Sequence, residues 1–576
     1  MTFCNRFLFM GFFPSPDLEL TAKKDNFARS GSSGLPRRPH AATTECGGRG
    51  RKKKWKELIT VFHQTTQEGT QKMGNTNNPG PRAGLRARDP RTLAAAKAVE
   101  MDDCFRDGRG GCYSHDGRRL LAFDDGSATA YEVRRGVEEL CASAFAGCRA
   151  LRRVALPPGL RLIGSSAFEG CAALEGVAIP DSVAGIGASA FSSCTSLSSC
   201  TLPTGLRRLG AAAFAACPSL GQLVLPRALE SIGGNPLPAT PIAHLVSLSP
   251  HFTAIGPWLL TADGLRLIAY TGAESEVETP RGLRAIGDSA LACSTASEVS
   301  VAPTVEAIGP NAFGGCVRLE RVNLPQGLES IPDLAFAHCT SLRHISLPKG
   351  LRSLGAHAFE GCSQLEELAI PDSVEAVGDL ALGFCPRLQA VSFGRGIATV
   401  GAHPLLGSSP GRMESRGEAL ACQGHALLSE GGRRLVGLCA DDGLYRIPEG
   451  VATVGRLALA HRPRLERLEM GRSVVELEAA AVACSTGLTE VAASPGLEVI
   501  GRKAFFNCRS LKRVTLNAIP ARVAPDAFAM SLLPMDEDEA TPLPLLTFVV
   551  PKGCKTRLAR LLPQYKGRIE TPKPRP

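Results

Sequence analysis

A phenylalanine followed three residues later by a cysteine recurs at intervals of 23 residues along this 576-residue chain. Nine of the 20 cysteines occupy that repeat position, one of them after a leucine. Cysteines that a fold brings together can form disulfides or bind a metal ion. The pattern is carried by Phe145 and Cys148, Phe168 and Cys171, Phe191 and Cys194, Phe214 and Cys217, Phe313 and Cys316, Phe336 and Cys339, Phe359 and Cys362, and Phe505 and Cys508.

The period itself limits the chemistry of these cysteines. A fixed period of about 20 to 30 residues is typical of a stacked, quasi-one-dimensional solenoid. In such a stack, equivalent side chains of successive turns project in parallel about 4.8 Å apart. A disulfide needs Cβ atoms roughly 3.8 Å apart and a near-perpendicular dihedral angle, which parallel neighbours do not readily offer. We therefore predict a ladder of small buried thiols, in preference to disulfides or a metal site.

Other reactive residues show no catalytic arrangement. The sequence contains no HExxH, Walker A or CxxC motif. Its 11 histidines are scattered, and His338, His344 and His357 stand at different repeat positions. Aspartate and serine recur together at turns, as in Asp181-Ser182, where their side chains can bond the backbone. The sequence predicts no enzymatic activity, no cofactor and no metal.

The repeat unit reads as two short strands and a turn segment. In residues 151–173, Leu151–Leu156 alternates between apolar and polar residues, as a half-buried strand does. Pro157 ends that strand because it lacks the amide donor that a ladder requires. Leu160–Ile163 is a second extended segment, and we expect a helical turn or two over Ser165–Cys171. One turn alone would expose apolar residues on both flanks, so the unit must stack.

Three segments interrupt the repeats with the signature of a β-hairpin. They are Cys112–Phe123, Trp258–Tyr270 and Ala426–Leu438. Asp116-Gly117 and Asp263-Gly264 are dipeptides typical of type I′ turns, and Gly431-Gly432 can serve likewise. We expect each hairpin to restart a block of repeats.

The positive charge of the chain is confined to its first hundred residues. The formal charge is +10, and residues 1–100 hold 18 Lys and Arg against 8 Asp and Glu. The repeat body is therefore neutral, which does not favour nucleic-acid binding by the body. The apolar stretch 7–13 lacks a clear secretory cleavage site, and no stretch approaches the roughly 20 apolar residues of a membrane-spanning helix. We expect these residues to be a disordered basic leader. Alternatively, the start codon is assigned too far upstream and the protein begins at Met73 or Met101.

Strand alternation predicts which side chains face solvent. The outward positions of the first strand of each repeat hold no Trp or Tyr, the usual anchors of tight interfaces. This favours a broad surface that makes weak, multivalent contacts with protein partners. Within it, Arg321, Asn323, His344 and Glu367 form the mixed-charge patch that we predict to bind a protein.

Several repeats resemble a known family closely. Leu174–Cys194 reads LEGVAIPDSVAGIGASAFSSC, and Leu365–Pro386 differs mainly in having Leu382 for phenylalanine. Both resemble the BspA-type leucine-rich repeat, LxxVxIPxSVxxIGxxAFxxC. The resemblance covers roughly residues 113–570. It implies a leucine-rich-repeat solenoid of stacked short β-strands with short helical turns, interrupted by β-hairpin modules. Leu546–Glu570 resembles the family's closing strand and helix.

The resemblance also implies a function. It suggests a monomeric cell-surface or secreted adhesin that binds host or matrix proteins such as fibronectin, or other cells. An intracellular scaffold or regulator in the cytoplasm is the alternative, because the chain lacks a clear signal peptide and is rich in thiols. The expected organisation is a leader (1–100), hairpin and repeat blocks (112–240, 241–410 and 411–535), an acidic loop with a C-terminal cap (536–570), and a tail (571–576).

Overall fold

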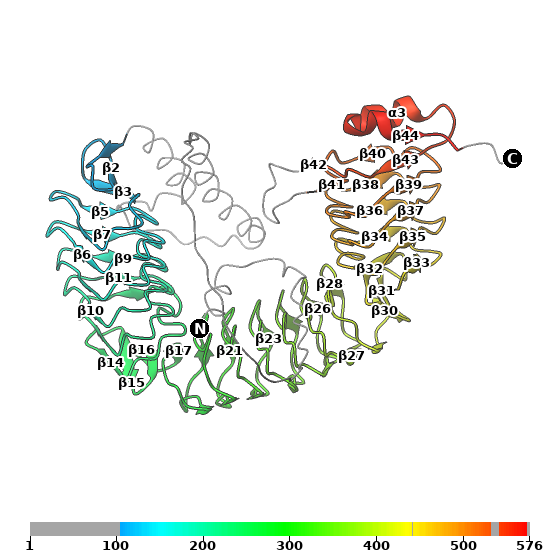
Figure 1. Ribbon diagram of the computed structural model, residues 1–576. Helices are drawn as coiled ribbons and strands as arrows, with labels where there is room; N and C mark the ends of the chain where they lie inside the picture. Colours follow the sequence, from blue (N-terminus) through cyan, green and yellow to red (C-terminus); the bar gives the residue numbers. More distant parts are fainter. Residues whose placement is uncertain (1–103, 441, 531–540, 573–576) are drawn as a thin grey trace, which may run out of the picture.

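The repeats stack into a long arc. The computed structural model describes residues 104–440, 442–530 and 541–572. These residues form a β-solenoid of about 19 turns with little helix. The first block forms one arm of the arc, the second its base and the third the other arm (Figure 1). The leader predicted over 1–100 and the acidic run at 536–539 lie outside the described residues.

Nearly every turn contributes one short strand, of three or four residues except for the two-residue β44, to a ladder on the outer side of the arc (Figure 1). The strands pair in parallel at equivalent repeat positions, so that Arg153 lies opposite Gly176. We call this the outer ladder, and its strands have the following bounds: β4 (Ala130–Glu132), β6 (Arg153–Ala155), β8 (Gly176–Ala178), β10 (Ser199–Thr201), β12 (Gln222–Leu225), β14 (His244–Ser247), β18 (Glu276–Glu278), β20 (Glu298–Ser300), β22 (Arg321–Asn323), β25 (Glu367–Ala369), β27 (Ala390–Phe393), β29 (Arg412–Ser415), β33 (Leu444–Arg446), β35 (Arg467–Glu469), β37 (Glu490–Ala492), β39 (Arg513–Thr515), β43 (Thr547–Val549) and β44 (Ile569–Glu570).

A second ladder, of two-residue strands, lies nearer the inside of the arc. It also pairs in parallel, with Glu139 opposite Leu162. Its strands, the inner ladder, are β5 (Glu139–Leu140), β7 (Leu162–Ile163), β9 (Gly185–Ile186), β11 (Arg208–Leu209), β13 (Ser231–Ile232), β19 (Ala285–Ile286), β21 (Ala307–Ile308), β23 (Ser330–Ile331), β24 (Ser353–Leu354), β26 (Ala376–Val377), β28 (Thr399–Val400), β34 (Thr453–Val454), β36 (Glu476–Leu477), β38 (Val499–Ile500) and β40 (Arg522–Val523).

The segment expected to be helical is a series of turns. Two residues of left-handed conformation flank the buried phenylalanine, Ser166 with φ 55° and Gly170 with φ 71°. A left-handed residue cannot continue a right-handed helix, so each repeat makes successive tight turns here instead. The turn segments are also joined between repeats, because the amide of Phe145 donates to the carbonyl of Ala167 at 2.7 Å.

These left-handed positions predict a stabilising substitution. Ala216 has φ 52° at the repeat position that Gly170 occupies two turns earlier. A non-glycine residue in this conformation costs roughly 1–2 kcal/mol, so we expect Ala216→Gly to raise the free energy of unfolding by about 1 kcal/mol. Ala215 is the control, since it is fully buried and lies outside the left-handed region. Urea denaturation should show that Ala215→Gly lowers the free energy of unfolding. An equal decrease for Ala216→Gly would show that its left-handed conformation is not strained.

The three hairpins each contain one strand more than the sequence predicted. Each is a three-stranded antiparallel unit whose last strand continues the inner ladder, so it starts a new block. The units are β1 (Phe105–Arg106) with β2 (Gly111–Tyr113) and β3 (Arg119–Phe123), β15 (Phe252–Ile255) with β16 (Trp258–Thr261) and β17 (Arg266–Tyr270), and β30 (Leu420–Gln423) with β31 (Ala426–Ser429) and β32 (Arg434–Leu438).

The predicted turn type is wrong in the first two hairpins. A type I′ turn needs positive φ at both central residues, but at Asp116-Gly117 only the glycine has it, with φ 69°. The amide of Gly117 donates to the carbonyl of Ser114 at 2.8 Å, so the turn is centred one residue earlier. The Asp116 carboxylate accepts the Ser114 hydroxyl at 2.6 Å, which fixes the aspartate outside the left-handed region. Asp263-Gly264 is arranged in the same way.

The third hairpin does have two left-handed central residues. They are Glu430 (φ 54°) and Gly431 (φ 64°), again one residue earlier than the predicted Gly431-Gly432. The amide of Gly432 closes the turn on the carbonyl of Ser429 at 3.1 Å.

The C-terminal end of the stack is covered. After the short hairpin β41 (Ala529–Met530) and β42 (Thr541–Pro542), the chain adds β43, the helix α3 (Lys555–Leu561), the 3-10 helix η1 (Pro563–Arg568) and β44. The hydroxyl of Tyr565 donates to the carbonyl of Phe528 at 2.7 Å, and Leu558 is fully buried. This cap covers apolar residues that the last repeat would otherwise expose.

Candidate protein-binding surface

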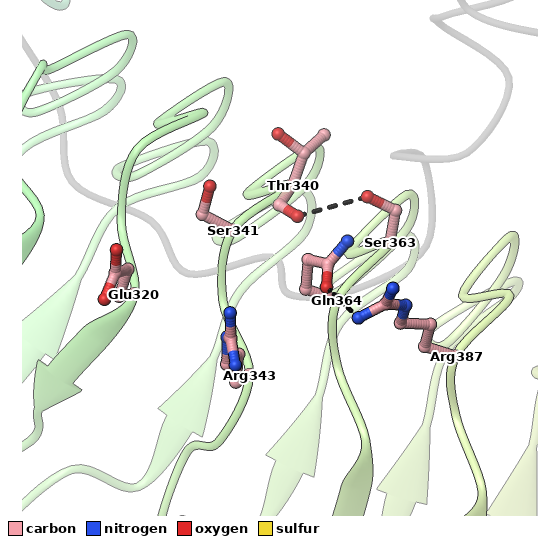
Figure 2. Close-up of a pocket in the computed structure, with 7 residues that line it drawn as sticks. All are labelled: Glu320, Thr340, Ser341, Arg343, Ser363, Gln364 and Arg387. Carbon is pink, nitrogen blue, oxygen red and sulfur yellow. Dashed lines mark hydrogen bonds between the residues drawn. The ribbon is translucent and has the colours of Figure 1, made fainter.

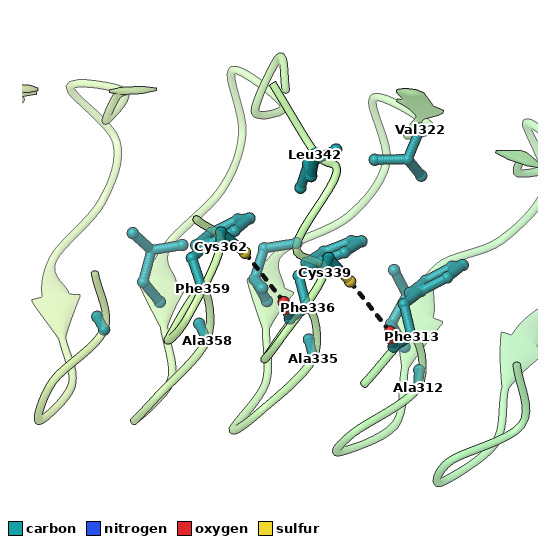
Figure 3. Packing of buried hydrophobic residues seen from close by; sticks show 14 of the residues in the cluster. Ala312, Phe313, Val322, Ala335, Phe336, Cys339, Leu342, Ala358, Phe359 and Cys362 are labelled. Carbon is teal, nitrogen blue, oxygen red and sulfur yellow. Dashed lines mark hydrogen bonds between the residues drawn. The ribbon is translucent and has the colours of Figure 1, made fainter. Parts of the chain in front are cut away.

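The buried phenylalanines set the spacing of the exposed strands. Phe168 and Phe191 are fully buried, and their ring centroids lie 5.1 Å apart with the rings nearly parallel. Figure 3 shows the equivalent rings of the second block, Phe313, Phe336 and Phe359, side by side in successive turns. The ring spacing is close to the strand spacing of about 4.8 Å, so the core holds the outer ladder in register.

The ladder cysteines form a second file beside these rings. All of them are free thiols. The Sγ of Cys171 donates to the carbonyl of Phe145 at 3.1 Å, and the Sγ of Cys194 to that of Phe168 at 3.2 Å. Figure 3 shows the equivalent hydrogen bond from Cys339 to the carbonyl of Phe313. Every ladder thiol after Cys148 thus donates to a carbonyl of the preceding turn, which a sequence period alone does not reveal.

Among the residues that the structure describes there is one disulfide, which the sequence did not predict. It joins Cys104 to Cys112 in the first hairpin, outside the ladder. No repeat position marks these residues; only the strand pairing of β1 with β2 brings them together.

Burial makes the ladder thiols unreactive. It raises the pKa of the Cys171, Cys217 and Cys385 thiols to about 12. Because thiolate is the reactive form, a maleimide should modify these cysteines only after unfolding, and raising the pH from 7 to 9 should not help. Peptide mass spectrometry provides the measurement, with the half-buried Cys554 outside the ladder as the control. Modification of Cys171 at the rate of Cys554 in the folded protein would contradict this prediction.

The outward positions of the outer ladder are exposed, as strand alternation requires. On β22, Arg321 and Asn323 are exposed while Val322 between them is 6% exposed. The predicted patch is divided, however. Arg321 donates to the Glu298 carboxylate of β20 through Nε at 3.0 Å and Nη2 at 2.7 Å, and this bond raises the pKa of Arg321. Asn323 donates to the hydroxyl of Ser300 at 3.0 Å.

The other two predicted residues, His344 and Glu367, line a groove of about 860 Å³. His344 is 3.9 Å from the carboxylate of Glu366, and its side chain is 61% exposed. Arg321 and Asn323 do not line this groove.

A gap in the outer ladder exposes apolar side chains in the groove. In the described part of the outer ladder, the turn that contains His344–Leu347 is the one repeat without a strand. Ile345 and Leu347 are only half-buried there, as is Leu324 of the preceding turn, whereas Leu368 and Ile370 of the next turn are 2% and 3% exposed. Side chains that normally belong to the core therefore reach the surface.

The groove carries balanced charge. Three cations, Lys349, Arg412 and Arg416, line it together with three carboxylates. Arg412 donates to the Glu414 carboxylate at 2.8 Å. The sequence analysis did not single out the groove residues of β29. Alternation could have indicated that they face solvent, but Arg412 follows its partner Ala390 by 22 residues, which departs from the 23-residue period.

A second, polar hollow lies on the edge of the same turns (Figure 2). It is about 500 Å³ in volume and includes Arg343 and Arg387. Its hydroxyls are engaged in the stack, since Ser341 donates to the carbonyl of Val317 at 2.7 Å. Ser219 makes the equivalent bond to Thr195 at 2.7 Å in the first block. The hollow is therefore part of the repeat architecture.

Within residues 104–440, 442–530 and 541–572, no cluster of three or more His, Cys, Asp or Glu is arranged to hold a metal ion. In the same ranges no helix has the length and apolarity needed to span a membrane.

A family model for the BspA type leucine rich repeat region matches six copies along the chain, over residues 121–238, 275–408 and 445–533. The matched residues make up more than half of the sequence. The chain belongs to the BspA-type leucine-rich-repeat family. The comparison with curated proteins found no match.

Several solved structures are similar to this BspA-type solenoid. A leucine-rich cell-surface protein of Faecalibacterium prausnitzii is 22% identical, with a TM-score of 0.41, 57% of this chain covered and 96% of that chain. The pneumococcal vaccine antigen PcpA is 15% identical, with a TM-score of 0.36 and coverages of 80% and 94%. A leucine-rich-repeat protein of Bacteroides ovatus is 19% identical, with a TM-score of 0.29 and coverages of 81% and 97%.

A BspA-type repeat solenoid indicates a protein-interaction role, and proteins of this family are generally not enzymes.

Proposed function

We propose that this BspA-type solenoid is an adhesin-like protein of the cell surface that binds host or matrix proteins such as fibronectin, or proteins of other cells. The observation that carries the proposal is the exposed outer ladder with its groove of about 860 Å³. His344 and Glu367 are the proposed contacts within the groove, and Arg321 and Asn323 flank it on β22.

The chemistry of the surface supports a protein partner that is held by many modest contacts. The half-buried Ile345 and Leu347 offer apolar area for a partner's side chains. The balanced charges around them favour a partner segment of low net charge. No Trp or Tyr lines the groove to act as a single dominant anchor. The protein acts as a monomer that gains strength from repeated contacts along the arc.

A steric block in the groove tests the proposal. Ala369 is exposed and lines the groove, so Ala369→Arg fills it without entering the core. We expect this variant of the full-length protein to bind immobilised fibronectin at least tenfold more weakly than the unmodified chain. The matched control is Ala178→Arg, at the same exposed position of β8 in the first block. Equal binding by both variants would refute the groove, and no binding by the unmodified chain would refute fibronectin as the partner.

The free thiols favour a second candidate, an intracellular scaffold or regulator. Sixteen cysteines among the described residues are not in a disulfide, and such thiols persist in reducing compartments. Protease treatment of intact source cells separates the two candidates. Release of repeat peptides from intact cells supports the adhesin, whereas peptides recovered only after lysis support the scaffold.

A further inference from the structure

The second and third blocks meet through their turn segments. The hairpin β30–β32 restarts the chain there, and Leu380 and Leu406 of the second block form one apolar cluster with Ala460 of the third. The rings of Phe384 and His461 lie 6.0 Å apart, edge to face, across the same junction. At its rim Arg456 pairs with Asp379. This junction holds one arm of the arc to its base.

A histidine is enclosed at the centre of this junction. His403 is 0% exposed, and its Nε2 lies 3.2 Å from the carbonyl of Leu438 and 3.0 Å from Nη2 of Arg462. Its Nδ1 is buried without a hydrogen-bond partner. Arg462 is itself only 2% exposed and stands at the repeat position where most turns carry the ladder cysteine.

Only a neutral His403 suits these surroundings. Neutral imidazole with its proton on Nε2 donates to the carbonyl of Leu438 and leaves Nδ1 without a proton that needs an acceptor. Imidazolium has a proton on both nitrogens, so its Nδ1–H would be buried without an acceptor beside a guanidinium. The titratable and charged groups that act on His403 are Arg462 and His461 of the third block, and neither is a carboxylate.

The remaining neighbours of His403 do not reverse this balance. β32 contributes the backbone of Gly437, which approaches the ring closely, and the carbonyl of Leu438. The thiol of Cys439 follows, and burial raises its pKa to about 12, so it stays neutral. The carboxylate of Asp379 is engaged by Arg456 at the rim.

We propose that this junction is an acid-sensitive latch, which protonation of His403 opens so that the third block detaches from the second. The open arm would change the arc that presents the outer ladder, and the latch does not depend on which protein the ladder binds.

The direction of the pH effect follows from the buried state. Burial, and next the charge of Arg462, lower the pKa of His403 well below its ordinary value and that of His461 to about 4. A histidine that is released on opening regains a pKa of about 6.5. The latch is therefore fully stable above about pH 6.5 and weakens as the pH falls from there towards 4. At pH 5 one such histidine favours the open state by about thirtyfold.

The other block junction provides an internal control. Asn235 occupies the same repeat position between the first and second blocks and is 2% exposed. Its side-chain amide donates to the carbonyl of Ser289 across that junction at 2.8 Å. An amide does not titrate in this range, so acid should leave the first junction closed.

Hydrogen exchange of the full-length protein at pH 7.4 and 5.0, corrected for the intrinsic rates, tests the latch. We expect protection of peptides from 401–440 and 455–462 to fall at least tenfold at pH 5.0, while peptides around Asn235 keep theirs. Equal protection of the second junction at the two pH values would overturn the proposal, and this comparison needs no variant.

Two substitutions identify the titrating group. His403→Asn, which copies Asn235, should reduce the acid effect at least tenfold. His115→Asn is the matched control, because it removes an exposed histidine of the first hairpin and should leave the acid effect unchanged. An unchanged acid effect in His403→Asn would overturn the assignment. These measurements involve no binding partner. A result against the latch would therefore leave the proposed function standing, and a result against the proposed function would leave the latch standing.

Discussion

Replacement of Phe191 by alanine is expected to lower the free energy of unfolding of the first block by about 3–5 kcal/mol. Phe191 is fully buried, and its ring lies 5.1 Å from that of Phe168 and 5.2 Å from that of Phe214. Removal of the ring leaves a cavity that both neighbours border, and the strand pairing of adjacent turns prevents its collapse. Urea denaturation followed by circular dichroism would measure the loss.

The exposed Phe105 is the control for this substitution. Its ring is 50% exposed and contacts the guanidinium of Arg134 at 4.9 Å. Phe105→Ala should cost about 1 kcal/mol or less. A cost below about 1 kcal/mol for Phe191→Ala as well would show that the phenylalanine file is not the core of the solenoid.

A single methyl group at Gly210 is expected to be the second most damaging change. A Cβ at this position would lie 2.3 Å from the backbone nitrogen of Ala188 in the preceding turn. Neither of the two turns can move apart to make room for the methyl group without breaking the inner ladder, in which Leu209 pairs with Ile186. We expect Gly210→Ala to destabilise the first block by about 3 kcal/mol, the upper part of the range for overpacking.

Gly159 allows the same change without the clash. A Cβ there would meet no atom within 4 Å, and neither glycine has a positive φ. Gly159→Ala should therefore shift the free energy of unfolding by no more than about 0.5 kcal/mol. Thermal unfolding of the two variants side by side provides the comparison. Equal stability of the two variants would show that the turns at Gly210 and Ala188 are not packed as closely as the structure indicates.

The sequence period predicted the stack because every repeat buries the same residue types. Phe168 and Cys171 could be placed in the core from their spacing alone, since one turn cannot bury them. The conformation of the turn segment could not be predicted in this way. Ser166 and Ala216 adopt left-handed conformations that neither residue type favours, and the stacking of neighbouring turns imposes them.

The groove and the junction depend on contacts that leave no pattern in the sequence. The segment His344–Leu347 alternates like every other outer strand, yet it forms no ladder bonds. His403 and Arg462 are 59 residues apart, and only the restart of the solenoid at β30–β32 brings them together. Alternation correctly indicated that His344 and Glu367 face solvent, but it could not show that they line a groove beside the missing strand.

Hydrogen exchange of the full-length protein with and without bound fibronectin tests most directly whether the outer ladder is a protein-binding surface. Slower exchange on binding is expected in peptides that cover 343–349, 367–373 and 412–416, with no change in the turn segments. Protection confined to the turn segments, or an absence of any change under saturating fibronectin, would contradict a binding role for this face.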